Sequence, residues 1–177
     1  MVYFIGGIAG VGKTSRLLDK LKRKNIICFE TDDLRPRLDI KIEGLTVDDF
    51  AWVCVRHIMK HYLRHSPQSN LAFLGVACEP KCINQLESES GTEMRTALIG
   101  SSKQFHRFER YPKPEPSEEK KSSRLEMEVK ELKLSNCEYF DLVKFASPEE
   151  RDKHLVRLTE KEVATFADKI INRLIRY

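Results

Sequence analysis

The chain has 177 residues, of which 41% are hydrophobic and 33% are charged, with 31 Lys and Arg against 27 Asp and Glu. This length is typical of about one domain that buries a core without disulfides or structural metal. The composition excludes a disordered tail, a collagen-like fibre and a membrane bundle. A net charge of +4 is too small to indicate a nucleic-acid-binding protein by itself, but it suits a site that receives anions.

Targeting signals and metal-binding cysteine patterns are not expected. The longest apolar runs, at 1–11 and 71–78, are shorter than the ~20 residues that span a bilayer. The first run has no basic residues before it, so a signal peptide is not expected. The five cysteines lie among apolar or helical residues, which favours reduced thiols and a cytoplasmic protein. Cys78 and Cys82 have no second pair, so a zinc site there is not expected.

Strands and helices are predicted to alternate along the chain. Short apolar runs predict strands covered on both faces, and apolar stripes at helical spacing predict the covering helices. In chain order we expect strand 2–6, helix 13–24, strand 26–29, helix 47–65, strand 71–76, helix 80–88, strand 95–99, helix 103–111, helix 117–134, strand 139–145 and helix 159–175. Thr46 and Ser147 are expected N-caps, and Asn25 an expected helix stop.

This alternation implies an α/β fold with a parallel sheet covered by helices on both sides. No internal repeat is visible in the sequence. The stretch 111–117 is the most linker-like, but it is too short and too central to divide two stable domains. We therefore expect a single domain over residues 1–177.

The motif that carries the chemistry runs from Gly7 to Thr14, G-I-A-G-V-G-K-T, and fits G-x-x-x-x-G-K-[ST]. It follows a predicted strand and opens a predicted helix, which is the context that supports a phosphate-binding P-loop. Its glycines let successive backbone N–H groups converge on phosphate, and the helix N-terminus adds positive partial charge. A glycine-rich turn without a ligand is the disfavoured alternative.

The motif predicts a nucleotide site for ATP and Mg²⁺. Lys13 is expected to reach the β- and γ-phosphates, Thr14 to coordinate Mg²⁺ through its hydroxyl, and Ser15 to lie near the α-phosphate. The predicted cofactor-binding residues are Gly7, Gly10, Val11, Gly12, Lys13, Thr14 and Ser15.

The order of elements resembles the nucleoside-monophosphate-kinase-like group of P-loop NTPases, which includes small-molecule kinases. The D-x-x-G and N-K-x-D motifs of GTPases are absent. The resemblance implies a three-layer sandwich whose five-stranded parallel sheet has the order 2-3-1-4-5. It also implies a helical lid between strands four and five, here residues 101–135.

The E-T-D-D-L-R segment that begins at Glu30 follows the second predicted strand, where open α/β sheets bind ligands. It resembles a segment of gluconate and shikimate kinase relatives, of archaeal 2-phosphoglycerate kinases and of polynucleotide 5′-hydroxyl kinases. That resemblance implies that Asp32 binds and deprotonates the acceptor hydroxyl, with Glu30 or Asp33 assisting. It also implies that Glu30 helps Thr14 hold the metal and that Arg35 binds an anionic group of the acceptor. The alternative is a helix N-cap with solvated acids.

Two further features concern the rest of the site. Relatives often carry an acid near the end of the third strand, where this chain has Leu74, with Glu79 following. The basic stretch after the fourth strand includes Lys103, Arg107 and Arg110, and a transferring phosphoryl group needs such positive charge around it. The resemblance makes Arg107 the preferred lid arginine, and a solvated helix face is the alternative. It also places an adenine-contacting loop at 146–148.

His57, His61 and His65 recur every four residues on the long predicted helix, a spacing that can hold a metal. No Glu completes an H-E-x-x-H pattern, and the neighbouring residues are cationic. Packing of the helix face or contact with the acceptor is therefore favoured over a zinc site.

We expect an ATP-dependent kinase that phosphorylates a hydroxyl of a small anionic metabolite. One alternative enlarges the acceptor to a polynucleotide 5′-hydroxyl or a nucleotide-sugar. Another, motivated by Leu74, is a nucleotide-binding regulatory protein with little turnover. Nucleic acid is a possible but not a favoured partner, and no membrane partner is expected.

Overall fold

The computed structural model describes residues 1–7, 13–34, 44, 46–75, 80–105, 126–127, 130 and 136–175. Its centre is a five-stranded parallel sheet in the order β2-β3-β1-β4-β6. The strands are β1 (Val2–Gly7), β2 (Ile27–Glu30), β3 (Leu71–Leu74), β4 (Met94–Gly100) and β6 (Cys137–Asp141). Counted along the chain within this sheet, the order is 2-3-1-4-5, so the predicted topology is confirmed.

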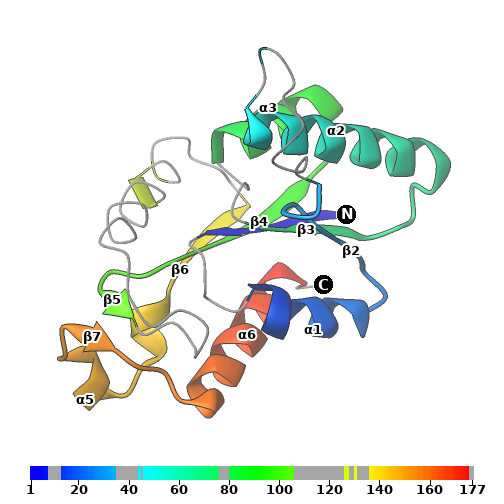
Figure 1. Cartoon of the computed structure of the whole chain (residues 1–177). Helices are drawn as coiled ribbons and strands as arrows, with labels where there is room; N and C mark the ends of the chain where they lie inside the picture. The colour runs from blue at the N-terminus through cyan, green and yellow to red at the C-terminus, as the bar shows by residue number, and fades with distance from the viewer. Residues whose placement is uncertain are drawn as a thin grey trace.

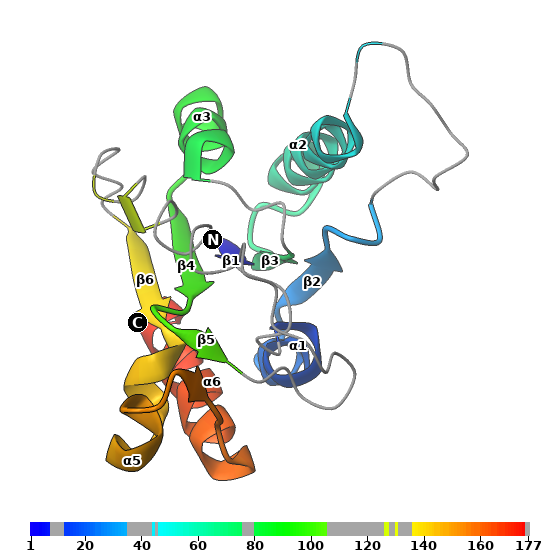
Figure 2. The same cartoon turned by 60° about the vertical axis from the view of Figure 1, so that its left-hand side comes forward.

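Helices cover both faces of the sheet (Figure 1). One face carries the π-helical turn η1 (Lys13–Leu17), α1 (Leu18–Lys22) and α6 (Glu160–Leu174). The other carries α2 (Val47–His65) and α3 (Pro80–Ser90), as the turned view in Figure 2 also shows. The 3₁₀ turn η2 (Leu142–Phe145) and the short helix α5 (Pro148–Arg151) follow β6.

Two apolar clusters fill the spaces between the layers. On the α1–α6 side, residues such as Ile5, Leu17 and Phe166 pack together. On the α2–α3 side, Phe4 and Phe73 stack at 5.3 Å between ring centroids. Both sides of each central strand are therefore buried, which explains why these strands read as continuous apolar runs rather than alternating ones.

Two expected elements are wrong. The helix predicted from Lys103 does not begin there: Gln104–Phe105 form the short strand β5, which pairs in parallel with β7 (Leu155–Val156). The fifth main strand ends at Asp141 rather than continuing to Phe145. The reason is local, because the Asp141 carboxylate accepts a hydrogen bond from Val143 N at 3.1 Å and so caps the following 3₁₀ turn.

The predicted helix boundaries are confirmed where a cap defines them. The Thr46 hydroxyl accepts from Asp49 N at 3.1 Å, and the Asp49 carboxylate accepts from Thr46 N at 2.9 Å, so α2 begins with a capping box. At the start of α5, the Ser147 hydroxyl accepts a hydrogen bond from Glu150 N and so caps that helix. Asn25 has φ 57°, the left-handed conformation typical of a residue that follows a helix end. None of the described helices is long and apolar enough to cross a membrane.

Candidate active site

The first P-loop glycine ends β1 in a conformation that excludes other residues. Gly7 has φ 121°, and a Cβ built there would lie 2.0 Å from the carbonyl oxygen of Ile99 on β4. The close β1–β4 pairing therefore requires glycine at this position. Gly10, Val11 and Gly12, the other predicted loop residues, lie outside the described residues.

Lys13, the P-loop lysine, is almost buried. It opens η1 with 7% of its surface exposed, and its Nζ donates a hydrogen bond to the Gly7 carbonyl oxygen at 3.1 Å. The side chain thus turns back toward the end of β1. Because burial of an ammonium group is costly without partners, such an amine is held by acceptors and is available to bind an anion.

The predicted metal pair, Thr14 and Glu30, is brought together from two separate elements. The Thr14 hydroxyl donates to Glu30 Oε2 at 2.8 Å, although the residues are 16 positions apart in sequence. Strand alternation explains the contact, since Glu30 shares the α1-facing side of β2 with Cys28. Ser15, one residue further along η1, is exposed.

The acceptor segment forms a tight turn immediately after β2. Asp33 N donates to the Glu30 carbonyl at 3.1 Å, and Leu34 N donates to the Thr31 carbonyl at 3.2 Å. The turn leaves Asp32 and Asp33 exposed at the carboxyl edge of the sheet, next to Glu30. Of the predicted acids, Glu30 therefore contacts the P-loop threonine and Asp32 and Asp33 follow it in the turn, whereas Arg35 lies outside the described residues.

Thr31, in the middle of this segment, was missed by the sequence reasoning. Its side chain is 1% exposed, and its hydroxyl has no hydrogen-bond partner among the described residues. A Cβ at Gly75, just after β3, would lie 1.7 Å from Thr31 Oγ1, so the threonine occupies the space that the glycine leaves. The one available signal was its position next to Glu30, because alternation turns it toward the opposite face of the sheet.

Leu74 ends β3 and is 1% exposed, packed in the α1-side cluster. The sheet register aligns it with Glu30 on one side and Ile5 on the other. An apolar side chain thus stands at the end of β3, between the acidic segment that follows β2 and the end of β1. Glu79, the next acid along the chain, lies outside the described residues.

Of the three cations proposed for the lid, the structure describes Lys103. Arg107 and Arg110 lie outside the described residues. Lys103 is described, and its Nζ donates to the carbonyl oxygens of Arg151 and Lys153, so it caps the end of α5 rather than contacting the P-loop. The adenine-loop candidate is also fixed, because Arg151 Nε donates to the Ala146 carbonyl at 2.7 Å.

The oxygen set at Thr14 and Glu30 fits Mg²⁺. No group of three His, Cys, Asp or Glu side chains that could hold a metal occurs in the described part of the chain. Mg²⁺ does not need one, because it prefers hard oxygen ligands and commonly takes one or two protein ligands together with phosphate oxygens and water. A hydroxyl and a carboxylate in contact beside a buried lysine meet that requirement.

The sheet order, the helix layers and the strand–loop–helix motif give this chain the α/β fold of the P-loop NTPases. It is similar to a structure from the PezAT chromosomal toxin–antitoxin system of Streptococcus pneumoniae, with 18% identity, a TM-score of 0.50, and coverage of 100% of this chain and 88% of that one.

Two further similar structures are kinases. A gluconokinase from Sinorhizobium meliloti has 14% identity and a TM-score of 0.46, over 98% of this chain and 94% of that one. A shikimate kinase from Bacteroides thetaiotaomicron has 12% identity and a TM-score of 0.47, over 100% and 99%. No protein-family model and no curated protein sequence matches the chain.

Proposed function

We propose that the chain is an ATP-dependent phosphotransferase that moves the γ-phosphoryl group to a hydroxyl of a small anionic metabolite. The observation that supports this most strongly is the contact of the P-loop Thr14 hydroxyl with Glu30 at 2.8 Å, beside the buried Lys13. It joins the phosphate loop to the acidic segment that would receive the acceptor. The same pair would also serve a protein that only binds Mg²⁺ and a nucleotide, so the phosphotransferase proposal depends in addition on Asp32 and Asp33, which follow Glu30 in the sequence.

Each residue has a distinct part in the proposal. The Lys13 ammonium group, which donates to the Gly7 carbonyl oxygen, would donate to phosphate oxygens instead when the nucleotide binds. Thr14 and Glu30 hold Mg²⁺, which supplies neutralisation of phosphate charge when it is bound. Asp32 accepts the proton of the acceptor hydroxyl as its oxygen bonds to phosphorus and the bond to the departing ADP oxygen breaks.

Arg35 and Arg107 complete the proposal, as the anion-binding residue of the acceptor site and the lid cation that stabilises the transferring group. Asp33 assists Asp32. A cytoplasmic setting belongs to the same proposal.

The test is γ-phosphoryl transfer from ATP to a panel of sugar acids and other hydroxylated anionic metabolites. We expect Lys13→Ala to abolish transfer, and Asp32→Ala to lower kcat by about 10²–10⁴-fold, the usual effect of removing a general base. The control is Asp19→Ala, which removes an exposed carboxylate of α1. If Asp32→Ala retained full turnover on the best acceptor, its assigned role would be wrong.

A second candidate is a nucleotide-binding regulatory protein with little turnover. It is favoured by Leu74, whose buried apolar side chain stands where relatives often have an acid. Tight ATP binding without transfer to any acceptor in the panel would support it over the kinase. Transfer to a polynucleotide end or a nucleotide-sugar, in place of a small metabolite, would support the larger-acceptor alternative.

A further inference from the structure

The second half of α2 and the strand that follows it carry charge of a single sign. Between Phe50 and Cys78 the sequence contains no Asp or Glu, but it contains Arg56, Lys60 and Arg64 as well as three histidines. This stretch therefore has a formal charge of +3, against +4 for the whole chain. The small net charge of the whole protein therefore does not show that this stretch contains positive charges and no negative ones.

These basic side chains face solvent. Ala51, Val55 and Met59 form the buried stripe of α2, each 1% exposed. The opposite stripe, here called the basic face, consists of the exposed residues His57, Lys60, His61, Arg64 and His65. The basic face thus presents cations and imidazoles over the last three turns of the helix.

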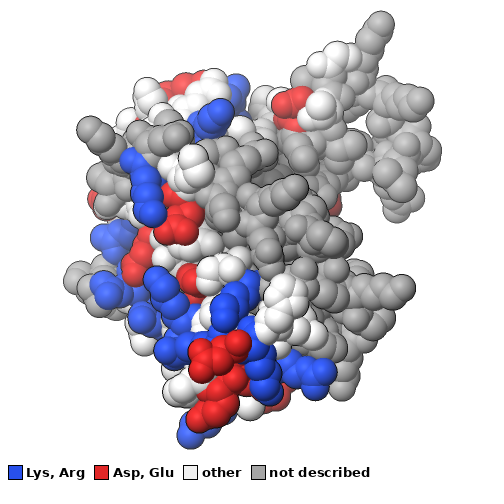
Figure 3. Space-filling model, turned by 90° about the vertical axis from the view of Figure 1, so that its left-hand side faces the viewer, with Lys and Arg blue, Asp and Glu red and all other residues white. Residues whose placement is uncertain are grey.

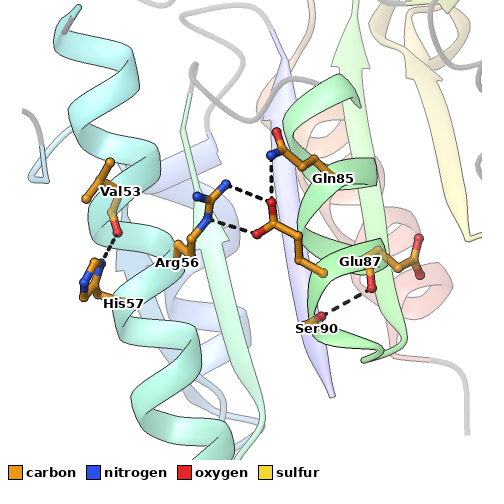
Figure 4. A network of polar contacts seen from close by, with 7 residues as sticks. Val53, Arg56, His57, Gln85, Glu87 and Ser90 are labelled. Atoms are coloured by element: carbon orange, nitrogen blue, oxygen red, sulfur yellow. Dashed lines mark hydrogen bonds and ion pairs between the residues drawn. The ribbon is translucent and has the colours of Figure 1, made fainter. Parts of the chain in front are cut away.

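Among the residues that the structure describes, no acidic side chain pairs with the cations of the basic face. Arg56, at its border, pairs with Glu89 of α3 at 3.3 Å, and Gln85 donates to the same carboxylate (Figure 4). Lys60 and Arg64 make no ion pair with any residue that the structure describes. Glu89 is thus committed to Arg56 and leaves the outer cations without an acidic partner among the described residues.

Some other described surfaces mix the two signs, whereas Lys22, Arg23 and Lys24 form a second, shorter group of exposed cations at the end of α1. On α6, Lys161 lies between Glu160 and Glu162. On the side of the molecule that holds β5, β7 and α5, acidic and basic atoms are intermingled (Figure 3). Stabilisation of a helix C-terminus by cations acts only within the last turn, so it does not explain a face that begins at His57.

We propose that the basic face of α2 binds the phosphate backbone of a nucleic acid. From His57 to His65 the helix rises about 12 Å, which matches about four nucleotides of one strand. Lys and Arg neutralise phosphates, and imidazole N–H groups donate to phosphate oxygens. A membrane surface is a poorer fit, because surface-binding helices insert several large apolar side chains beside their cations, and of the described side chains of α2 the one exposed apolar group is Val53, at 38%.

The basic face is separate from the proposed phosphoryl-transfer site. α2 begins after the carboxyl end of β2 and ends before the amino end of β3, so its C-terminal half lies toward the opposite edge of the sheet (Figure 1). Binding there does not require ATP or an intact P-loop. The inference therefore holds or fails independently of the proposed enzymatic activity.

The test is the salt dependence of binding to a fluorescein-labelled single-stranded RNA of about 20 nucleotides, followed by anisotropy at low ionic strength. We expect the Lys60→Ala, Arg64→Ala double variant to lower the slope of log K against log salt by about 1.4, or ~0.7 for each phosphate that is no longer neutralised. The control double variant, Lys161→Ala with Arg173→Ala on α6, should keep the wild-type slope. Both pairs are exposed, and circular dichroism reports whether either variant misfolds.

Three results would overturn the inference. The first is no binding of the wild type to the RNA at low salt. The second is an equal loss of slope in the α2 and α6 double variants, which would indicate a general charge effect. The third is binding to vesicles with anionic lipids, or to an acidic peptide, that is as tight as binding to the RNA and equally sensitive to the α2 variant.

Discussion

At the scale of single residues, Thr31 is the most unusual group in the site. A buried hydroxyl without a hydrogen bond costs about 1–3 kcal/mol of stability. Thr31 lies between Glu30 and Asp32, so this destabilising group is adjacent to residues that the proposed chemistry needs. A side chain of this volume is nevertheless required, because Thr31 fills the space that Gly75 leaves beside it.

We therefore expect Thr31→Val to raise the free energy of unfolding by about 1 kcal/mol, since valine keeps the shape and removes the unpaired oxygen. Thr31→Ala should instead destabilise the protein, because it also removes the methyl group. Urea titration of the three proteins measures both effects. A destabilised Thr31→Val variant would mean that the hydroxyl has a partner in solution, such as a bound water.

Residue-level reasoning predicted that Thr14 and Glu30 lie together because both positions are defined by residue type and spacing. Lys13 and Thr14 are defined by a local motif, and Glu30 by its place at a strand end. The burial of Thr31 was not predictable in this way. It depends on the contact with Gly75, 44 positions later in the chain, which exists only after β2 and β3 pair.

At the scale of elements, a capping box begins each of the two long helices α2 and α6. In α6, the Glu162 carboxylate accepts hydrogen bonds from Thr159 N at 2.7 Å and from the Thr159 hydroxyl at 2.8 Å. The backbone hydrogen bond is the main cause that lowers the pKa of Glu162 below its ordinary value of 4.5. Ionised Glu162 therefore favours the folded state.

Because the pKa of Glu162 is lowered in the folded state, its contribution to the free energy of unfolding is complete above about pH 4.5. That contribution is lost as the pH falls through the pKa of the folded state. We expect Glu162→Gln to lower the melting temperature at pH 7, and the difference from the wild type to shrink between pH 5 and pH 3. Asp152→Asn, at the exposed C-cap of α5, is the control. A difference that stays constant over this pH range would contradict the assignment.

The elements that sequence reasoning placed correctly have local signals, whereas the misplaced strand β5 has none. Thr46 with Asp49 marks the start of α2 in the sequence itself. By contrast, β5 has two residues, and it is a strand because β7 lies beside it some 50 positions later. Such a short pair has no periodicity to detect, and the basic residues around it suggested a helix instead.

At the scale of the whole molecule, charged side chains gather at two places, which the net charge of the protein does not reveal. The carboxyl edge of the sheet combines the buried Lys13 with the acids from Glu30 to Asp33, which is the mixed-sign environment that transfer of a phosphoryl group needs. The basic face of α2 lies toward the other edge. We interpret the first as the chemical site and the second as an interaction surface.

The central claim is that the carboxyl edge of the sheet is a site for ATP and Mg²⁺. Isothermal titration calorimetry with ATP, with Mg²⁺ or with EDTA, tests it most directly. We predict binding by the wild type that is tightened by Mg²⁺, binding weakened at least about tenfold in Lys13→Ala, and loss of the Mg²⁺ effect in Glu30→Gln, with Glu93→Gln unchanged. Absence of ATP binding by the wild type, or wild-type affinity in Lys13→Ala, would contradict the claim.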